Sequence, residues 1–145
     1  MKKTTLTVLA IMTVSLFGFG INKTNKEMTT MDFGTFSVSL AVKDINASIT
    51  FYESLGFSRI EGAGSIEQKW VILKKDDVKI GLFEGMFDQN ILTFNPTDAR
   101  GIHAKVEKAG VSVAHSSGLE NESGPCSFVI VDPDGNPILF DQHND

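Results

Sequence analysis

Short segments in which hydrophobic and polar residues alternate recur along the chain, and this period of two is typical of half-buried β-strands. The alternation is clearest at residues 36–42, which are also rich in β-branched and aromatic side chains. The same criteria predict strands at about 57–60, 69–73 and 78–83, and later at about 111–114, 127–131 and 137–141. The pattern therefore predicts a chain built largely of β-strands.

Two segments between the strands change to helical spacing, in which apolar residues recur every three or four positions. Their apolar lines are Ile45, Ile49, Tyr52 and Leu55 in the first, and Ala99, Ile102, Val106 and Ala109 in the second. Asp44 and Asp98 precede these lines, where a carboxylate can accept hydrogen bonds from free backbone N–H groups of the first turn. Gly56 and Gly110 follow them and can supply the positive φ that ends a helix. Both helices thus carry a start signal and a stop signal.

The chain contains an internal repeat. A shift of 54 positions places Leu40 on Phe94, and it also superposes Asp44 on Asp98. A later block aligns after a small insertion, with Gly81, Leu82, Phe83 and Glu84 over Ile138, Leu139, Phe140 and Asp141. A period of this length marks a repeated supersecondary unit. We therefore expect two copies of one unit, each consisting of a strand, a helix and three further strands.

The composition is that of an ordinary globular protein. Apolar residues make up 41% and charged residues 21% of the 145 residues, which suits one hydrophobic core. The formal net charge of −5, with no Lys/Arg cluster after the first residues, argues against nucleic-acid binding. Cys126 is the only cysteine, so an internal disulfide and a cysteine-based zinc site are excluded. Its strand-like surroundings predict a small buried hydrophobe rather than a nucleophile.

The first residues have the pattern of an export signal. A basic start at residues 1–3 precedes an apolar run over residues 6–19. We expect a signal peptide or membrane anchor, a polar linker and a single folded domain, at residues 1–20, 21–31 and 32–145 respectively. The favoured localisation is periplasmic or secreted. A membrane-anchored protein, or a cytoplasmic one that starts at an internal methionine, is the alternative.

Two stretches of the folded part carry a family resemblance. One is SLAVKDI at residues 39–45 followed by FYESLGF at residues 51–57, and the other is DPDGNPILF at residues 132–140. They are similar to the opening strand and helix, and to the closing hairpin, of the vicinal-oxygen-chelate proteins, the group of glyoxalases, bleomycin-resistance proteins and extradiol dioxygenases. The resemblance implies an α+β fold in which two paired βαβββ modules form a half-open, cup-shaped mixed sheet with the helices outside.

For the enzymes of that family, the resemblance implies a divalent metal held by a His or Glu from the first and fourth strand of each module. The metal chelates two neighbouring substrate oxygens and acts as a Lewis acid. Carried over position by position, the ligand positions are Ser37, Leu82, Ile91 and Leu139. None of these is a usual ligand for a hard or borderline divalent ion. We therefore predict no metal at this site and no other cofactor.

One alternative metal site stays open at the sequence level. Glu84 and Asp141 are equivalent in the repeat, and strand alternation predicts that both face the cup. Two carboxylates without a histidine could hold a metal weakly or attract a cationic ligand. We expect all three histidines to be surface residues: His103, His115 and His143.

The cup is expected to be lined by small polar side chains and by the sole tryptophan. The predicted ligand-binding residues are Ser37, Ser39, Trp70, Glu84, Thr93, Asn95 and Asp141. We predict a metal-free protein that binds an aromatic or cationic small molecule, similar to the bleomycin-resistance members, with no nucleic-acid or membrane partner for the folded domain. The resemblance also implies a homodimer. The alternative is a lactoylglutathione lyase-like or dioxygenase-like enzyme, with an atypical metal site at Glu84 and Asp141 or with acid–base chemistry alone.

Overall fold

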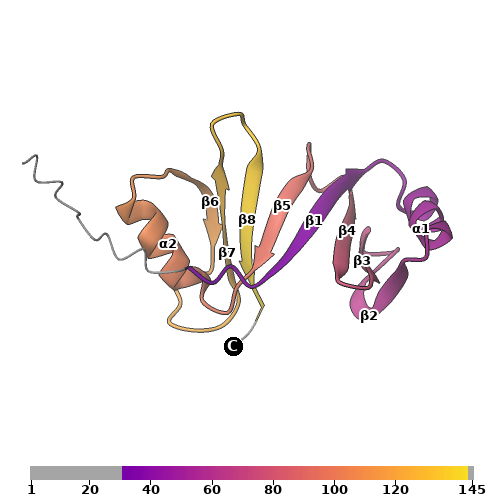
Figure 1. Cartoon of the computed structure of the whole chain (residues 1–145), viewed down its shortest axis with the longest axis horizontal. Coiled ribbons are helices and arrows are strands. Elements are labelled where there is room, and N and C mark those ends of the chain that lie inside the picture. The colour runs from indigo at the N-terminus through magenta and orange to yellow at the C-terminus, as the bar shows by residue number, and fades with distance from the viewer. Residues whose placement is uncertain (1–30, 144–145) are drawn as a thin grey trace, which may run out of the picture.

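The computed structural model describes residues 31–143, which form one open eight-stranded sheet with two helices (Figure 1). The signal or anchor predicted at residues 1–20, and nearly all of the predicted linker, lie outside the described residues. The strand order across the sheet is β2-β3-β4-β1-β5-β8-β7-β6. This is the α+β arrangement of two βαβββ modules that the resemblance implies.

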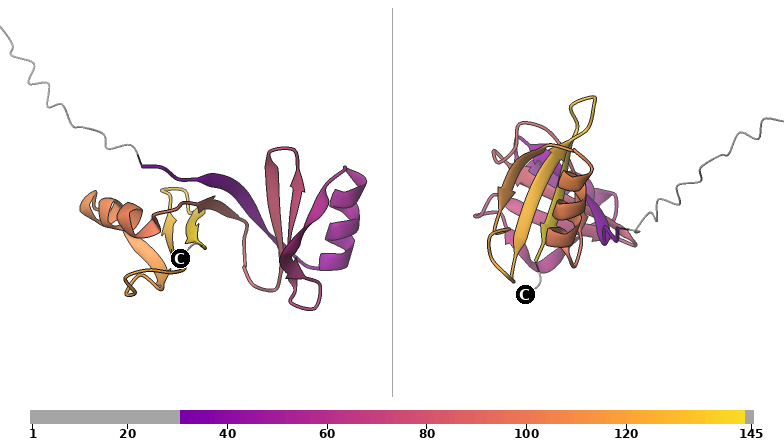
Figure 2. Two further views of the ribbon diagram at one scale, coloured as in Figure 1. Left: turned by 90° about the horizontal axis from the view of Figure 1, so that it is seen from below. Right: turned by 90° about the vertical axis from the view of Figure 1, so that its left-hand side faces the viewer.

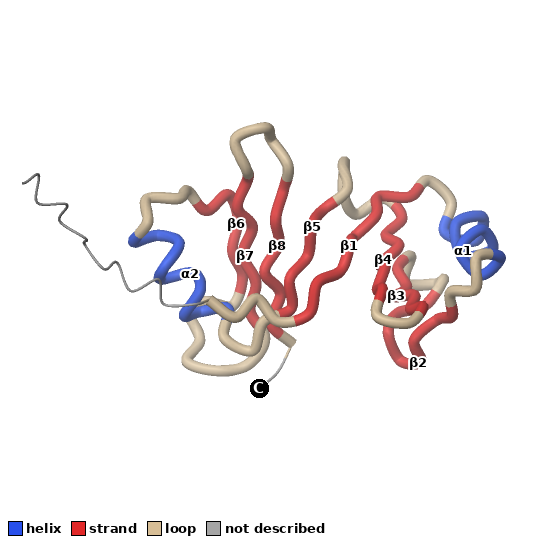
Figure 3. Tube along the Cα trace, viewed as in Figure 1, coloured by secondary structure: helices blue, strands red, loops and turns tan. Residues whose placement is uncertain are grey.

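The two modules have the same order of elements. The first consists of β1 (Thr35–Val42), α1 (Ile45–Ser54), β2 (Ser58–Ser65), β3 (Trp70–Lys75) and β4 (Val78–Glu84). The second consists of β5 (Ile91–Asn95), α2 (Ala99–Lys108), β6 (Val113–Ser117), β7 (Cys126–Val131) and β8 (Pro137–Gln142). In each module the first strand pairs in parallel with the last, and β1 joins β5 antiparallel at the centre of the sheet. The helices lie at the two ends of the molecule (Figures 2 and 3).

The predicted helix signals are confirmed at both ends of each helix. The Asp44 carboxylate accepts a hydrogen bond of 3.0 Å from the backbone N–H of Ala47, and Asp98 accepts one of 2.8 Å from that of Gly101. The glycines after the helices have φ values of +90° at residue 56 and +78° at residue 110. These short-range signals place both helices correctly because each depends only on neighbouring residues.

A local two-fold axis relates the modules. Val38 and Leu92 pair with each other between β1 and β5, and they are also equivalent under the 54-residue repeat. Equivalent residues that pair with each other must lie on either side of such an axis. The axis therefore passes between these two residues, at the centre of the sheet.

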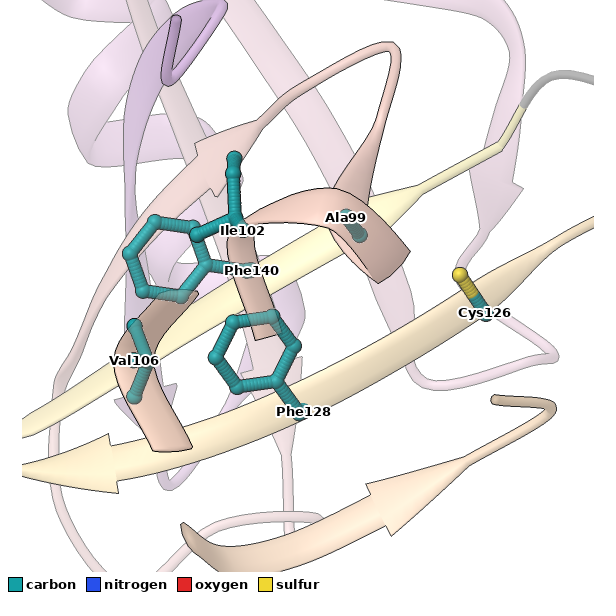
Figure 4. Close-up of a cluster of buried hydrophobic side chains, with 6 residues drawn as sticks. All are labelled: Ala99, Ile102, Val106, Cys126, Phe128 and Phe140. Carbon is teal, nitrogen blue, oxygen red and sulfur yellow. The ribbon is translucent and has the colours of Figure 1, made fainter. Parts of the chain in front are cut away.

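Each helix covers its own half of the sheet with a separate hydrophobic core. Ile102 and Val106 of α2 pack over Phe128 and Phe140, whose rings stack with centroids 4.8 Å apart (Figure 4). The cluster is completed by Ala99 and the buried Cys126, as predicted for that cysteine. The other core has the same design, with α1 residues over apolar side chains of β3 and β4: Ile45, Ile49, Val71, Leu73 and Leu82. Neither described helix is long and apolar enough to cross a membrane.

The closing strands align one residue away from the sequence alignment. Leu40 pairs with Leu82, and Phe94 pairs with Phe140, so Leu82 is equivalent to Phe140. Both side chains are fully buried under a helix. The prediction that Leu82 corresponds to Leu139 was therefore wrong. It matched identical residue types and did not consider which side of each strand faces the helix. The equivalent of Leu139 is Gly81.

Two connecting regions have more structure than the strand pattern predicted. The strand predicted at residues 57–60 continues to Ser65, with a register shift against β3 between Arg59 and Gly64. In the second module, the Arg100 side chain reaches from α2 into the loop at residues 118–124. Its guanidinium donates hydrogen bonds of 2.7–3.1 Å to four backbone carbonyls, those of Gly118, Asn121, Ser123 and Gly124. A charged side chain thus fastens this loop to the helix.

Candidate binding site

A cavity of about 730 Å³ opens on the face of the sheet opposite to the helices. Residues of β1, β2, β3, β4, β5 and β8 line it, together with residues 86 and 87 of the loop after β4 and the residue after β8. Both modules therefore contribute to one site. A volume of this size is in the range of pockets for drug-sized molecules.

The floor of the cavity is polar and lies at the local two-fold axis. Ser39 Oγ and Thr93 Oγ1 are 2.9 Å apart, and each residue is only 5% exposed. Nearby, Asn95 Nδ2 donates a hydrogen bond of 3.0 Å to the carbonyl of Thr35 and lies 3.4 Å from Ser37 Oγ. The Asn95 amide is thereby held in one orientation, with its side-chain oxygen left as an acceptor.

Aromatic rings form one end of the cavity. Trp70 of β3 and Phe83 of β4 stand opposite each other in register, and their rings are parallel with centroids 6.2 Å apart. Phe87 adds a tilted contact to Phe83, at 5.0 Å between centroids. Gly64 permits this packing, because a Cβ there would clash with the carbonyl and the indole of Trp70. The result is an apolar wall suited to a planar group.

Three ionisable side chains are among the residues that line the cavity: Lys79, Asp141 and His143. Asp141 Oδ2 and His143 Nε2 lie 3.4 Å apart, and the histidine side chain is 70% exposed. Burial raises the pKa of Asp141, and the neighbouring imidazole acts in the opposite direction. The prediction of His143 as a surface residue is confirmed, and the structure adds that its imidazole stands beside Asp141 at the cavity.

The structure brings six of the seven predicted ligand-binding residues together. They are Ser37, Ser39, Trp70, Thr93, Asn95 and Asp141. Glu84 is the exception, because its carboxylate accepts a 3.0 Å hydrogen bond from the backbone N–H of Ile45 and lies 3.2 Å from Lys69 Nζ. These contacts turn it to the helix side and lower its pKa. The prediction that Glu84 shares a site with Asp141 was wrong, and its cause is the one-residue error in the repeat.

The residues at the family's metal positions do not fit a metal ion. After the corrected alignment these positions are Ser37, Gly81, Ile91 and Leu139, with Gly81 in place of Leu82. Glycine has no side chain, the two aliphatic residues have no donor atom, and a single serine hydroxyl is a poor ligand. Within residues 31–143, no three His, Cys, Asp or Glu side chains form a group that could hold a metal.

Sequence reasoning missed three cavity residues on β4. Lys79 and Phe83 face the cavity together with Gly81, as the alternation of a strand requires once its phase is known. The repeat alignment of β4 was wrong by one residue, so these three residues were assigned to the helix side of the strand. Phe87 was considered as a stacking residue and does line the cavity, whereas Phe94 and Phe128 pack in or against the α2 core.

Comparisons of the sequence with known proteins give no match. No family model matches the chain, and no curated protein sequence matches it significantly. The similarity is confined to solved structures.

Three solved structures illustrate that similarity. A glyoxalase/bleomycin resistance protein/dioxygenase superfamily member from Vibrio splendidus 12B01 has a TM-score of 0.56 and 20% identity, covering 74% of this chain and 97% of its own. Methylmalonyl-CoA epimerase from Streptomyces coelicolor, in complex with 2-nitronate-propionyl-CoA, has a TM-score of 0.60 and 17% identity, with 79% and 100% covered. An NAD-dependent benzaldehyde dehydrogenase from Legionella pneumophila has a TM-score of 0.59 and 19% identity, with 75% and 99% covered.

These likenesses show the fold. The chain has the glyoxalase-like fold of the vicinal-oxygen-chelate proteins, as its two sequence motifs predicted. The three structures carry different names, and fold alone does not decide between activities. The chemistry of the cavity, and not the fold, therefore decides the function.

Proposed function

We propose that the protein binds a small molecule with an aromatic part in the cavity, and that it does so without a metal ion. The observation that carries the proposal is the composition of the cavity. An aromatic end formed by Trp70, Phe83 and Phe87 continues into a polar floor and an end with ionisable groups. Ligand pockets combine apolar walls with a few placed polar groups in this way.

The corrected metal positions support binding without a metal. The row at the bottom of the cup holds Gly81 and Leu139 where a metal site needs carboxylates or imidazoles. The buried hydroxyl pair of Ser39 and Thr93 lies in the middle of this row. It presents neutral groups to the ligand, which can orient a molecule by hydrogen bonding but cannot polarise it as a cation would.

Binding is measured through Trp70, which is the only tryptophan of the chain and lines the cavity. A panel of planar aromatic compounds is titrated into the chelator-treated protein while tryptophan fluorescence and thermal stability are followed. A true ligand raises the melting temperature with its concentration. The variant Thr93→Val should weaken binding, whereas Lys108→Met on the exposed side of α2 should not.

A metal titration tests whether the site is free of metal. The chelator-treated protein is titrated with Ni²⁺, Zn²⁺, Mn²⁺ and Fe²⁺, and bound metal is counted after gel filtration. We expect no stoichiometric binding and no rise in melting temperature. Binding of one ion per chain that is lost in Asp141→Ala would contradict a metal-free site.

We also propose that the protein is a homodimer. Phe36 and Leu92 are 48% and 39% exposed on the helix-bearing face of the two central strands, while α1 packs on β4 and α2 on β7 and β8. The middle of this face thus offers apolar surface that a second copy could cover. Light scattering tests it, and Phe36→Ser together with Leu92→Ser should give monomers.

We further propose that the folded part is exported, because a basic start and an apolar run precede it in the sequence. Expression of the full chain, cell fractionation and N-terminal sequencing of the mature protein test this. Recovery of an intact N-terminus from the cytoplasm would contradict it.

A further inference from the structure

The cavity has two chemically different ends, and the strand register shows which residues share each end. Phe83 pairs with Trp70 on one side and with Ala41 of β1 on the other, so the aromatic wall stands at the last residues of β1. Asn95 pairs with Thr35 at the first residues of β1. The aromatic end and the polar end are therefore separated along the strands.

Two groups of opposite charge stand at the polar end, on opposite walls. Lys79 comes just before Ile80, which pairs with Val38 of β1. Asp141 comes just after Phe140, which pairs with Phe94 of β5. Three strand spacings separate β4 from β8, about 14 Å along the curved sheet, and the cavity lies between them. Lys79 has no ion pair with any residue in the 31–143 range.

The charges of this end nearly cancel. Among residues 31–143, His143 is the only other ionisable side chain that lines the cavity, and it lies beside Asp141. A ligand with a single charge would meet one attractive and one repulsive wall. A ligand that carries both charges on its head group would be attracted by both walls. A cavity with two such walls therefore favours a zwitterion over a ligand with a single charge.

We propose that the ligand is an elongated aromatic zwitterion. Its ring lies against Trp70 and Phe83, an anionic group faces Lys79, and a cationic group faces Asp141. Phe83 lies four positions after Lys79 in β4, which is about 13 Å in a strand, and this distance sets the length of the molecule. The inference rests on the proposed function, because it assigns the ligand class of the same cavity. It also narrows the aromatic or cationic ligand that was expected from the sequence.

The test uses four probes with the same phenyl-butyl skeleton and different charges. They are homophenylalanine, 4-phenylbutylamine, 4-phenylbutyrate and 4-phenylbutan-1-ol, which are zwitterionic, cationic, anionic and neutral. Each is titrated near neutral pH against Trp70 fluorescence, excited at the red edge so that Tyr52 does not contribute. We expect homophenylalanine to bind about tenfold more tightly than the alcohol, and more tightly than either singly charged probe.

Charge-removing variants assign the two walls. Lys79→Met should weaken homophenylalanine and phenylbutyrate but not phenylbutylamine, and Asp141→Asn should weaken homophenylalanine and phenylbutylamine but not phenylbutyrate. Lys108→Met, outside the cavity, is the control and should change nothing.

The outcomes separate the two proposals. Equal binding of all four probes, unchanged in both variants, overturns the zwitterion and leaves the aromatic cavity standing. Tightest binding of phenylbutylamine, lost only in Asp141→Asn, also overturns it in favour of a cation. If none of the probes and no compound of the wider aromatic panel binds, the proposed function itself falls.

Discussion

The hydroxyl oxygens of Ser39 and Thr93 lie 2.9 Å apart, and the two residues are separated by the 54 positions of the repeat. Equivalent positions of the two modules therefore hydrogen-bond to each other across the axis between β1 and β5. Either hydroxyl can be the donor. Each residue is only 5% exposed on the cavity floor, so little solvent can replace the partner hydroxyl when one of the two is removed.

A double-mutant cycle measures this pair. Ser39→Ala and Thr93→Val should each lower the free energy of unfolding by about 1–3 kcal/mol, because each leaves one buried hydroxyl without its partner. The double variant should cost less than the sum of the two, since no orphaned hydroxyl remains. Urea denaturation of the four proteins gives the coupling. Strict additivity would show that the two hydroxyls do not depend on each other.

Two glycines of β2 form a matched pair for a second prediction. Gly62 and Gly64 both have positive φ, but a Cβ at residue 62 would meet nothing within 4 Å, whereas one at residue 64 would clash with Trp70. Gly62→Ala should cost about 1 kcal/mol of strain, and Gly64→Ala about 1–3 kcal/mol more from overpacking. Only Gly64→Ala should shift the Trp70 emission. Equal effects in both variants would mean that the indole is not held by the glycine.

The pH dependence of stability should carry the signature of Asp141. Its folded-state pKa is raised by burial, so protonation of this group favours the folded state. This contribution is complete below the ordinary pKa of 3.8 and is lost as the pH rises through the raised folded-state pKa. Asp141→Asn should therefore gain melting temperature relative to the parent protein near neutral pH, and the gain should vanish in acid.

The control for that experiment is Asp134→Asn, an exposed aspartate in the hairpin between β7 and β8. It should follow the parent protein at each pH. A constant offset for Asp141→Asn at every pH would instead point to packing, not titration, as the cause of any change.

Arg100 should control the order of the loop at residues 118–124. Arg100→Lys keeps the charge but cannot reach four carbonyls at once, so the loop should open more often. Glu120 and Glu122 lie in this loop, and a glutamate-specific protease should cut there at least several-fold faster in the variant. Global unfolding should change less, by about 1–2 kcal/mol. Unchanged cleavage would show that the loop is held by other contacts.

The helices and the fold could be predicted from the sequence because their signals are local or repeated. Asp44 and Gly56 mark the ends of α1 by chemistry that depends on adjacent residues only. The duplication then doubles the information, since each module confirms the other. The stretch that contains Asp44 and Gly56, together with the closing hairpin at residues 132–140 and the duplication, gave the family resemblance, and the solved structures agree with the fold that it implies.

The site could be predicted only in part, because it depends on which side chains of β4 face the cavity and which face the helix. The helix-facing pair of the two modules is Glu84 and Gln142, whose side-chain oxygens accept hydrogen bonds from the first backbone N–H of α1 and α2, at 3.0 and 2.8 Å. An alignment based on residue types does not favour pairing this glutamate with this glutamine, although their roles are equivalent. The sequence alignment matched Glu84 with Asp141 instead of Gln142. This error exchanged the cavity face and the helix face of β4.

Both modules contribute to the cavity, so a cut of the chain between the modules divides the binding site. Residues 31–87 supply the aromatic wall and Lys79, whereas residues 88–143 supply Thr93, Asn95 and Asp141. The two halves, made as separate polypeptides, would each hold an incomplete pocket with one hydroxyl of the central pair unmatched. Recovery of ligand-dependent Trp70 fluorescence on mixing them would then report directly on assembly of β1 against β5. The protein could in this way serve as a split sensor for its own ligand.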